Sequence, residues 1–366
     1  MKNIKKNLKY LLNFLFIAVI FWLTFRLLFS GQEFSEILSD LHMADVRWLG
    51  AGLVLAFMFV AGESAIIHYM LRILGQKTYF LRCLKYSFIG FFFSYITPSS
   101  SGGQPAQMYY MKKDGIKIGF STLIMLLITI AYKAVLVLLG LGFLIFNYGF
   151  VKDNVGRLGW LLILGFILNI LFIAALAFIF FKPLWARKAG IKIVNLLTGW
   201  RIVKPKNNEK YVSKIMRICD TYIMGSEYIK ENIHTIVNIF LITIVQRLSL
   251  IAVTWVVYKA YGLSGHSLLE ILALQTMINV AVDMLPLPGA AGVTEGSFMV
   301  MFGNIFGDDL VKPALLLSRG ISFYAVLIAG AIVTLAAHII VLRNDKKFAD
   351  ANGSNEENNK VINEKE

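Results

Sequence analysis

Long apolar runs, separated by short polar and basic stretches, dominate this chain. Six runs reach the roughly 20 residues that a helix needs to cross the hydrocarbon core of a bilayer: Tyr10–Phe29, Trp48–Leu71, Ile118–Phe146, Trp160–Phe181, Ile236–Tyr258 and Ala314–Leu342. One such run could be a buried helix of a soluble protein, but six predict an all-α, polytopic membrane bundle. Composition agrees, because 57% of the 366 residues are hydrophobic and only 16% are charged.

The first run shares one property with signal peptides, since Lys2, Lys5, Lys6 and Lys9 lie just before it or at its start. It is longer than the apolar core of a usual signal peptide, and no small-x-small cleavage motif precedes Ser30. We therefore expect this run to be a retained first helix.

Two shorter apolar segments each lead into a stretch through which a helix cannot continue. Tyr86–Ile96 is followed by Thr97-Pro-Ser-Ser-Ser-Gly-Gly-Gln-Pro105, and Ser267–Met284 is followed by Leu285-Pro-Leu-Pro-Gly-Ala-Ala-Gly292. Proline and clustered glycine end helices. Broken helices in matching positions of two halves are typical of a transport site near the bilayer midplane. Irregular backbone at that depth must line a polar cavity or be buried in protein.

The placement of charge indicates how these segments lie. Most of the 36 Lys and Arg residues gather in stretches that would be cytoplasmic under the positive-inside rule. Basic clusters flank the first interrupted segment on both sides, at Arg72–Lys85 and Lys112–Lys117, whereas both flanks of the second should be external. The pattern predicts about six full spans and two re-entrant hairpins in inverted arrangement, with both termini cytoplasmic in a bacterial cell membrane. The alternative is two ordinary external loops between short helices.

A single transmembrane domain is expected over residues 1–342, with a cytoplasmic insert at 182–233. The first part of the insert is basic and holds Trp185 and Trp200, a composition typical of an interfacial segment. Its second part, residues 208–232, has the spacing of an amphipathic helix. The tail at 343–366 is polar, and its composition favours disorder.

The net charge of +14 is no sign of nucleic-acid binding, because the basic residues lie between apolar runs. The two cysteines, Cys83 and Cys219, are far apart and the five histidines are scattered, so we expect no disulfide, metal site or cofactor. No residue is assigned a catalytic role.

Ionisable residues inside spans are the main candidates for function. Glu63, Lys133 and Arg247 each lie midway along an apolar run, and Asp283 and Glu295 flank the second break. Two alternatives stay open: Arg319, about two turns into the last span, could snorkel to the surface, and Glu63 could pair with Lys133 or Arg247. The two central cations need a buried anion, which is either a protein carboxylate or a ligand phosphate.

The first break adds a second candidate feature. Ser99, Ser100, Ser101, Gly102 and Gly103 offer hydroxyl groups and unhindered backbone N–H groups just before a new helical turn, with Gln104 following. Such a nest at a helix N-terminus suits an anion. Together with Lys133 and Arg247 it suggests a site for an anionic lipid headgroup.

The two interrupted stretches resemble the signatures of the lysylphosphatidylglycerol synthase transmembrane (flippase-like) family. Thr97–Gln107, followed by basic residues and Gly115, is similar to the first signature, and Leu285–Glu295 is similar to the second. Ala290 stands where the family usually has a second glycine, a mild departure because alanine is also small. The resemblance extends over about Lys5–Leu342.

The resemblance implies a lipid translocase for an anionic, aminoacylated or polyprenyl-phosphate lipid, with a contribution to resistance against cationic antimicrobial peptides. Family members with a soluble domain transfer lysine from lysyl-tRNA to phosphatidylglycerol, and we expect the tail at 343–366 to be too short to form that domain. Lysyltransferase activity and a non-catalytic role beside a separate synthase are therefore the alternatives. The implied partners are a membrane lipid, such a synthase, and further copies of the chain.

Overall fold

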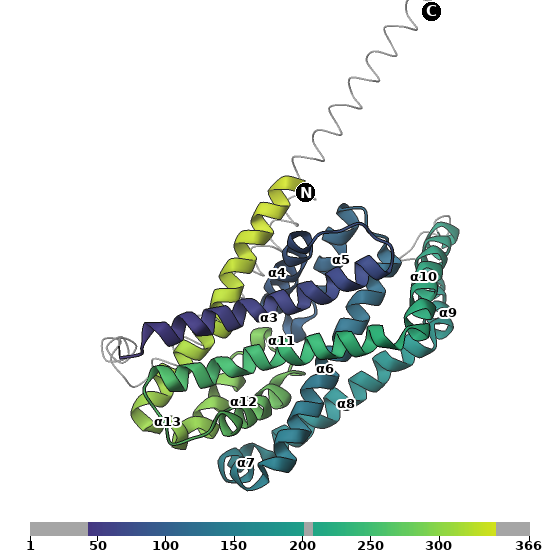
Figure 1. Cartoon of the computed structure of the whole chain (residues 1–366). Coiled ribbons are helices and arrows are strands. Elements are labelled where there is room, and N and C mark those ends of the chain that lie inside the picture. Colours follow the sequence, from purple (N-terminus) through teal and green to yellow (C-terminus); the bar gives the residue numbers. More distant parts are fainter. Residues whose placement is uncertain (1–42, 201–207, 342–366) are drawn as a thin grey trace, which may run out of the picture.

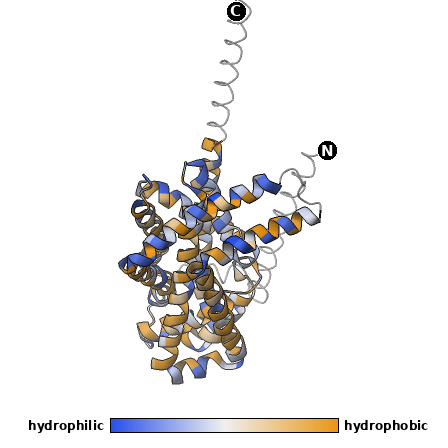
Figure 2. Cartoon of the chain, turned by 90° about the vertical axis from the view of Figure 1, so that its right-hand side faces the viewer, coloured by the Kyte–Doolittle hydropathy of each residue, from blue (hydrophilic) through white to orange (hydrophobic). Residues whose placement is uncertain are grey.

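The computed structural model describes residues 43–200 and 208–341, and every regular element in these ranges is helical. Five helical stretches are long and apolar enough to cross a membrane: Val46–Ile73, Ile118–Phe146, Tyr148–Phe181, Ile233–Ala260 and Pro288–Val341. They contain four of the six predicted runs in full and the run Ala314–Leu342 up to residue 341, while Tyr10–Phe29 and the tail at 343–366 lie outside the described residues. The all-α, polytopic membrane architecture is confirmed, and hydrophobic residues dominate the helical body in Figure 2.

Two long helices lie side by side along the bundle, α3 (Val46–Ile73) and α11 (Ile233–Ala260) (Figure 1). They approach closely because Gly62 has no side chain: a Cβ there would lie 2.8 Å from the Cβ of Gln246. Helix α6 (Ile118–Phe146) packs against both, and α8 (Gly159–Phe181) packs against α6. The short helices α7 (Tyr148–Val155) and η2 (Gly156–Leu158) connect α6 to α8.

The first interrupted segment forms a helical hairpin of α4 (Phe80–Ile96), η1 (Pro98–Ser100) and α5 (Gly103–Lys113). Helix α4 ends at Thr97, which is extended (φ −116°, ψ 146°) as expected for a residue before proline. Helix α5 then folds back onto α4 at close range, since a Cβ on Gly103 would lie 2.6 Å from the Gly90 carbonyl oxygen. The folded-back shape matches the prediction, and the membrane face from which it enters stays a prediction.

The second interrupted segment forms another hairpin, from α12 (Leu268–Val282), η4 (Pro288–Ala290) and α13 (Val293–Arg319). Helix α13 is kinked at Gly307, whose φ of 75° suits glycine. A π-helical turn, η5 (Gly320–Ala325), follows and leads into a helix that ends at residue 341 within the described part. The stretch after Gly307, a flank of this hairpin that is expected to be external, is helical.

The two breaks meet inside the bundle, because η1 contacts η4. The ring of Tyr95, near the end of α4, packs against that of Phe323 in η5 with centroids 4.5 Å apart. Ala290 has φ 50°, a left-handed conformation that glycine adopts more easily. The alanine at this position is therefore a conformational departure and not only one of size.

The insert folds as two packed helices, α9 (Pro183–Gly199) and α10 (Asn208–Glu231), at one end of the bundle (Figure 1). The predicted amphipathic helix at 208–232 is thus confirmed as α10. The basic segment before it, predicted only as an interfacial stretch, is also a helix.

Candidate functional site

Two cavities share a wall where the hairpins meet. The larger has a volume of about 440 Å³ and is lined by Glu63, Gln104 and Gln107 among others; we call it the Glu63 cavity. The smaller, about 170 Å³, is the Arg247 cavity. Five residues line both cavities: Tyr95, Ser99, Ser100, Tyr132 and Asp283. The polar cavity predicted from the broken helices is therefore present, divided in two by aromatic, hydroxyl and carboxylate side chains.

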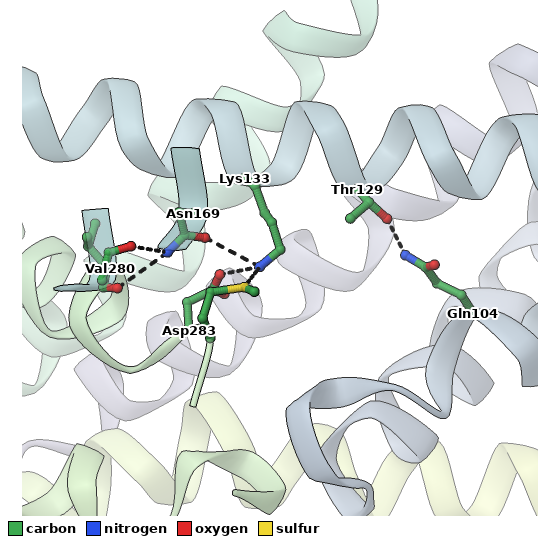
Figure 3. Close-up of polar contacts among 8 residues, drawn as sticks. Gln104, Thr129, Lys133, Asn169, Val280 and Asp283 are labelled. Atoms are coloured by element: carbon green, nitrogen blue, oxygen red, sulfur yellow. Dashed lines mark hydrogen bonds and ion pairs between the residues drawn. The ribbon is translucent and has the colours of Figure 1, made fainter. Parts of the chain in front are cut away.

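Lys133 has a carboxylate partner. Its ammonium group, projecting from α6, forms an ion pair with Asp283 at the end of α12 (Figure 3). Its Nζ also lies 3.4 Å from Asn169 Oδ1 and 3.1 Å from Met284 Sδ. Of the two anions left open for Lys133, the structure shows the protein carboxylate.

Arg319 is also paired. Its Nε donates to Glu295 Oε1 at 2.8 Å, and its Nη2 donates to the Gly289 carbonyl oxygen at 3.1 Å. Glu295 in turn accepts the Gly292 N–H at 2.6 Å, so one carboxylate caps α13 and holds Arg319. The side chain of Arg319 is largely buried, so the snorkelling alternative is wrong.

Glu63 does not pair with either central cation. It is buried in α3 and accepts a hydrogen bond from Gln107 Nε2 of α5. Glu63 also lines the larger cavity. The alternative that it neutralises Lys133 or Arg247 is wrong.

Arg247 differs from the other cations. The residue is 3% exposed, and its guanidinium carbon lies 3.4 Å from the centroid of the Tyr132 ring. Its Nε and Nη2 have no hydrogen-bond partner among the described residues, while Asp283 and Glu295 are engaged by Lys133 and Arg319. A buried guanidinium without an anion is unfavourable, and its fork of donors matches a phosphate.

Neutral polar groups surround Arg247 in its cavity. Thr254 Oγ1 donates to Gln275 Oε1 at 2.8 Å, and Gln275 Nε2 donates to Asn279 Oδ1 at 3.2 Å. The hydroxyl of Ser318 lines the same cavity, is buried, and has no partner among the described residues. The cavity therefore has both charged and neutral donors for an oxyanion.

The first break supplies hydroxyl groups rather than a complete nest. Ser99, Ser100 and Ser101 are exposed and line the Glu63 cavity, and Gln104 bonds to Thr129 on α6 (Figure 3). The N–H groups of Ser100, Ser101 and Gly102 are already bonded, to Thr97 O, Pro98 O and Thr97 Oγ1. The prediction of unhindered N–H groups is wrong for these three residues. Gly102 and Gly103 serve close packing instead, since a Cβ on either would lie within 3 Å of neighbouring atoms.

Several residues of the site were not singled out from the sequence. Gln107 and Asn169 are uncharged, but a polar side chain inside an apolar run, as at Asn169, is a usable signal. Tyr95 and Tyr132 carry no such signal, since aromatic residues are common in spans. Their place in the wall depends on how distant helices pack.

These features define a polytopic helical membrane protein with a charged, polar centre between two interrupted helices. The chain belongs to the family described as "Lysylphosphatidylglycerol synthase TM region", whose match covers residues 10–330. A curated relative is a "UPF0104 membrane protein" of Archaeoglobus fulgidus, 26% identical over 269 residues, which are 71% of this chain and 77% of the relative.

Proposed function

We propose that this protein is a lipid translocase that binds a phosphate-bearing headgroup between its two hairpins and moves it across the cell membrane. The observation that carries the proposal is Arg247, a buried cation that lines a cavity and lacks a carboxylate partner in the described part of the chain. Phosphate is common to the three candidate substrates: an anionic phospholipid, an aminoacylated one, and a polyprenyl-phosphate lipid.

The cavities on either side of the shared wall support movement rather than static binding. A headgroup leaving Arg247 would next meet the hydroxyls of Ser99 and Ser100, which line both cavities, and then Glu63. Parting the Tyr95 and Phe323 rings would open the wall. For an aminoacylated headgroup, Glu63 offers a carboxylate to the amino group while Arg247 holds the phosphate. Export of such a cationic lipid would lower binding of cationic antimicrobial peptides.

The proposed topology places both termini in the cytoplasm. It rests on the distribution of Lys and Arg, which gather around α9 and α10 and beside the first hairpin. The hairpins would then enter from opposite faces, as in transporters with inverted repeats.

A flip assay in proteoliposomes tests the function. The leaflet exposure of fluorescent phosphatidylglycerol is measured by dithionite quenching for the wild type, for Arg247→Met and for Arg157→Met, an exposed arginine in η2. We expect flipping by the wild type and the control variant, and its loss in Arg247→Met. Equal rates with and without the protein would refute the proposal. Lysyl-phosphatidylglycerol made from lysyl-tRNA by the purified chain would establish the lysyltransferase alternative instead.

A further inference from the structure

The exposed face of α9 carries an apolar stripe. Its residues recur with the spacing of one helical face and are Trp185, Ala189, Ile193, Leu196 and Trp200, the last at the end of the helix. The four large side chains are half or more exposed, at 62% for Trp185, 57% for Ile193, 50% for Leu196 and 65% for Trp200. An exposed apolar stripe of this size needs an apolar neighbour.

Helix α10 does not supply that neighbour, because it packs on the other side of α9. Val194 is buried, Gly190 approaches the side chain of Ile215, and Arg187 forms an ion pair with Asp220 at 3.2 Å. Helix α10 is in turn fixed against α6, where a Cβ on Gly119 would lie 2.6 Å from the Ile218 carbonyl oxygen. The stripe therefore keeps a fixed direction relative to the bundle.

The stripe lies next to the end of two spans. Pro183 begins α9 immediately after α8 ends at Phe181, and the rings of Phe178 and Trp185 lie 6.1 Å apart in an edge-to-face contact. Lys230 at the end of α10 reaches the Phe181 carbonyl oxygen at 3.5 Å, just before α11 begins. The two ends of the insert therefore lie close together, beside the end of α8 and the start of α11.

Charge beside the stripe identifies the surface that would cover it. Lys188 and Lys192 are exposed and lie one turn apart along one border of the stripe, and Lys182 precedes the helix. Apolar residues bordered by lysine, with tryptophan near both ends, form the pattern of a helix lying in the interface of an anionic leaflet. A protein partner would be expected to show a mixed polar rim rather than lysine alone.

We propose that α9 lies in the headgroup layer of its own membrane, with the Trp185–Trp200 stripe inserted and Lys188 and Lys192 bound to anionic phospholipid headgroups. This surface is separate from the Arg247 cavity, and the proposal does not depend on transport. The predicted interfacial segment is then a lipid-binding site whose binding face is the Trp185–Trp200 stripe.

Lipid-borne quenchers test the proposal on the full chain in vesicles. Cys83 and Cys219 are replaced by serine, and an environment-sensitive fluorophore is attached at Ile193→Cys or, as a second stripe position, at Leu196→Cys. The control is Asn195→Cys, an exposed residue on the same helix but off the stripe. We expect a blue-shifted emission at 193 and 196, quenched by a nitroxide near the lipid headgroup more than by one near the chain end. The label at 195 should stay water-exposed.

The lysines are tested in the same assay. Lys188→Glu with Lys192→Glu should reduce quenching at 193 in vesicles containing phosphatidylglycerol and change it little in pure phosphatidylcholine. Labels at 193 and 196 that are no more quenched than the label at 195 would overturn the proposal. Protection at 193 that rises with protein concentration, without lipid quenching, would also overturn it, since it would mean that a second copy covers the stripe.

Discussion

The guanidinium of Arg247 lies 3.4 Å above the ring of Tyr132, whereas Lys133, the next residue along α6, is held by Asp283. Two adjacent residues of α6 are thus involved with two buried cations that differ in whether they have an anionic partner. Lys133 is neutralised by a carboxylate, whereas among the described residues Arg247 has the face of an aromatic ring and no carboxylate partner. This contrast leads to two opposite expectations for stability.

Replacing Arg247 should leave the fold almost as stable as before. Arg247→Met removes a cation–π contact of about 2 kcal/mol but also removes the desolvation of an unpaired charge, so the two changes largely offset. We expect a free energy of unfolding within ~2 kcal/mol of the wild type, measured by thermal unfolding in detergent. A much larger loss would mean that Arg247 has a structural anion and is not a ligand-binding group.

Breaking the Lys133–Asp283 pair should be costly on either side. Lys133→Met and Asp283→Asn each leave a buried charge unpaired, and each should lower the free energy of unfolding by roughly 3 kcal/mol. The double variant removes both charges and should recover much of that loss, which a double-mutant cycle measures. Strictly additive losses would contradict direct coupling.

The first hairpin depends on the absence of a side chain at Gly103. In Gly103→Ala the new Cβ would lie 2.0 Å from Ser94 Oγ and 2.6 Å from the Gly90 carbonyl oxygen, so α4 and α5 must separate. We expect a lower melting temperature and lost flipping. The matched control is Gly296→Ala in α13, where no atom lies within 4 Å. It should be neutral or stabilise by up to about 1 kcal/mol, and a similar melting temperature for the two variants would count against close hairpin packing.

Ala290 offers a test in the stabilising direction. The left-handed φ of Ala290 lowers the stability of the folded state by about 1 kcal/mol. A glycine would relieve this strain but would also increase the entropy of the unfolded chain, which offsets part of the stabilisation. Ala290→Gly should therefore raise the free energy of unfolding by less than about 1 kcal/mol. A loss of stability would contradict the strained conformation.

The spans and breaks could be predicted because their signals are local. Apolar runs, proline and clustered glycine act over a few residues, and five of the six runs appear as helices in the described part. The partners of the charges could not be predicted. Lys133 and Asp283 are 150 positions apart, and only the packing of α6 against α12 brings them together.

The charged candidates could be chosen from the sequence, but the contacts that each of them makes could not. All the charged candidates lie in or beside the two cavities. Arg247 has no carboxylate partner among the described residues because of how α11 packs against Tyr132. No sequence pattern predicts this packing. Likewise, the sequence does not indicate that the Gly102 N–H donates a hydrogen bond to Thr97 Oγ1 in the folded hairpin.

Site-specific photo-crosslinking tests the central claim, that a lipid headgroup binds at Arg247, most directly. A photoreactive amino acid replaces Leu250, which lines the Arg247 cavity, or Val245, an exposed position on the same helix. After illumination in native membranes, mass spectrometry identifies the adducts. We predict a phospholipid or polyprenyl-phosphate adduct at 250 that disappears in Arg247→Met, while lipid adducts at 245 persist in both. No lipid adduct at 250, or one that is unchanged by Arg247→Met, would contradict the account.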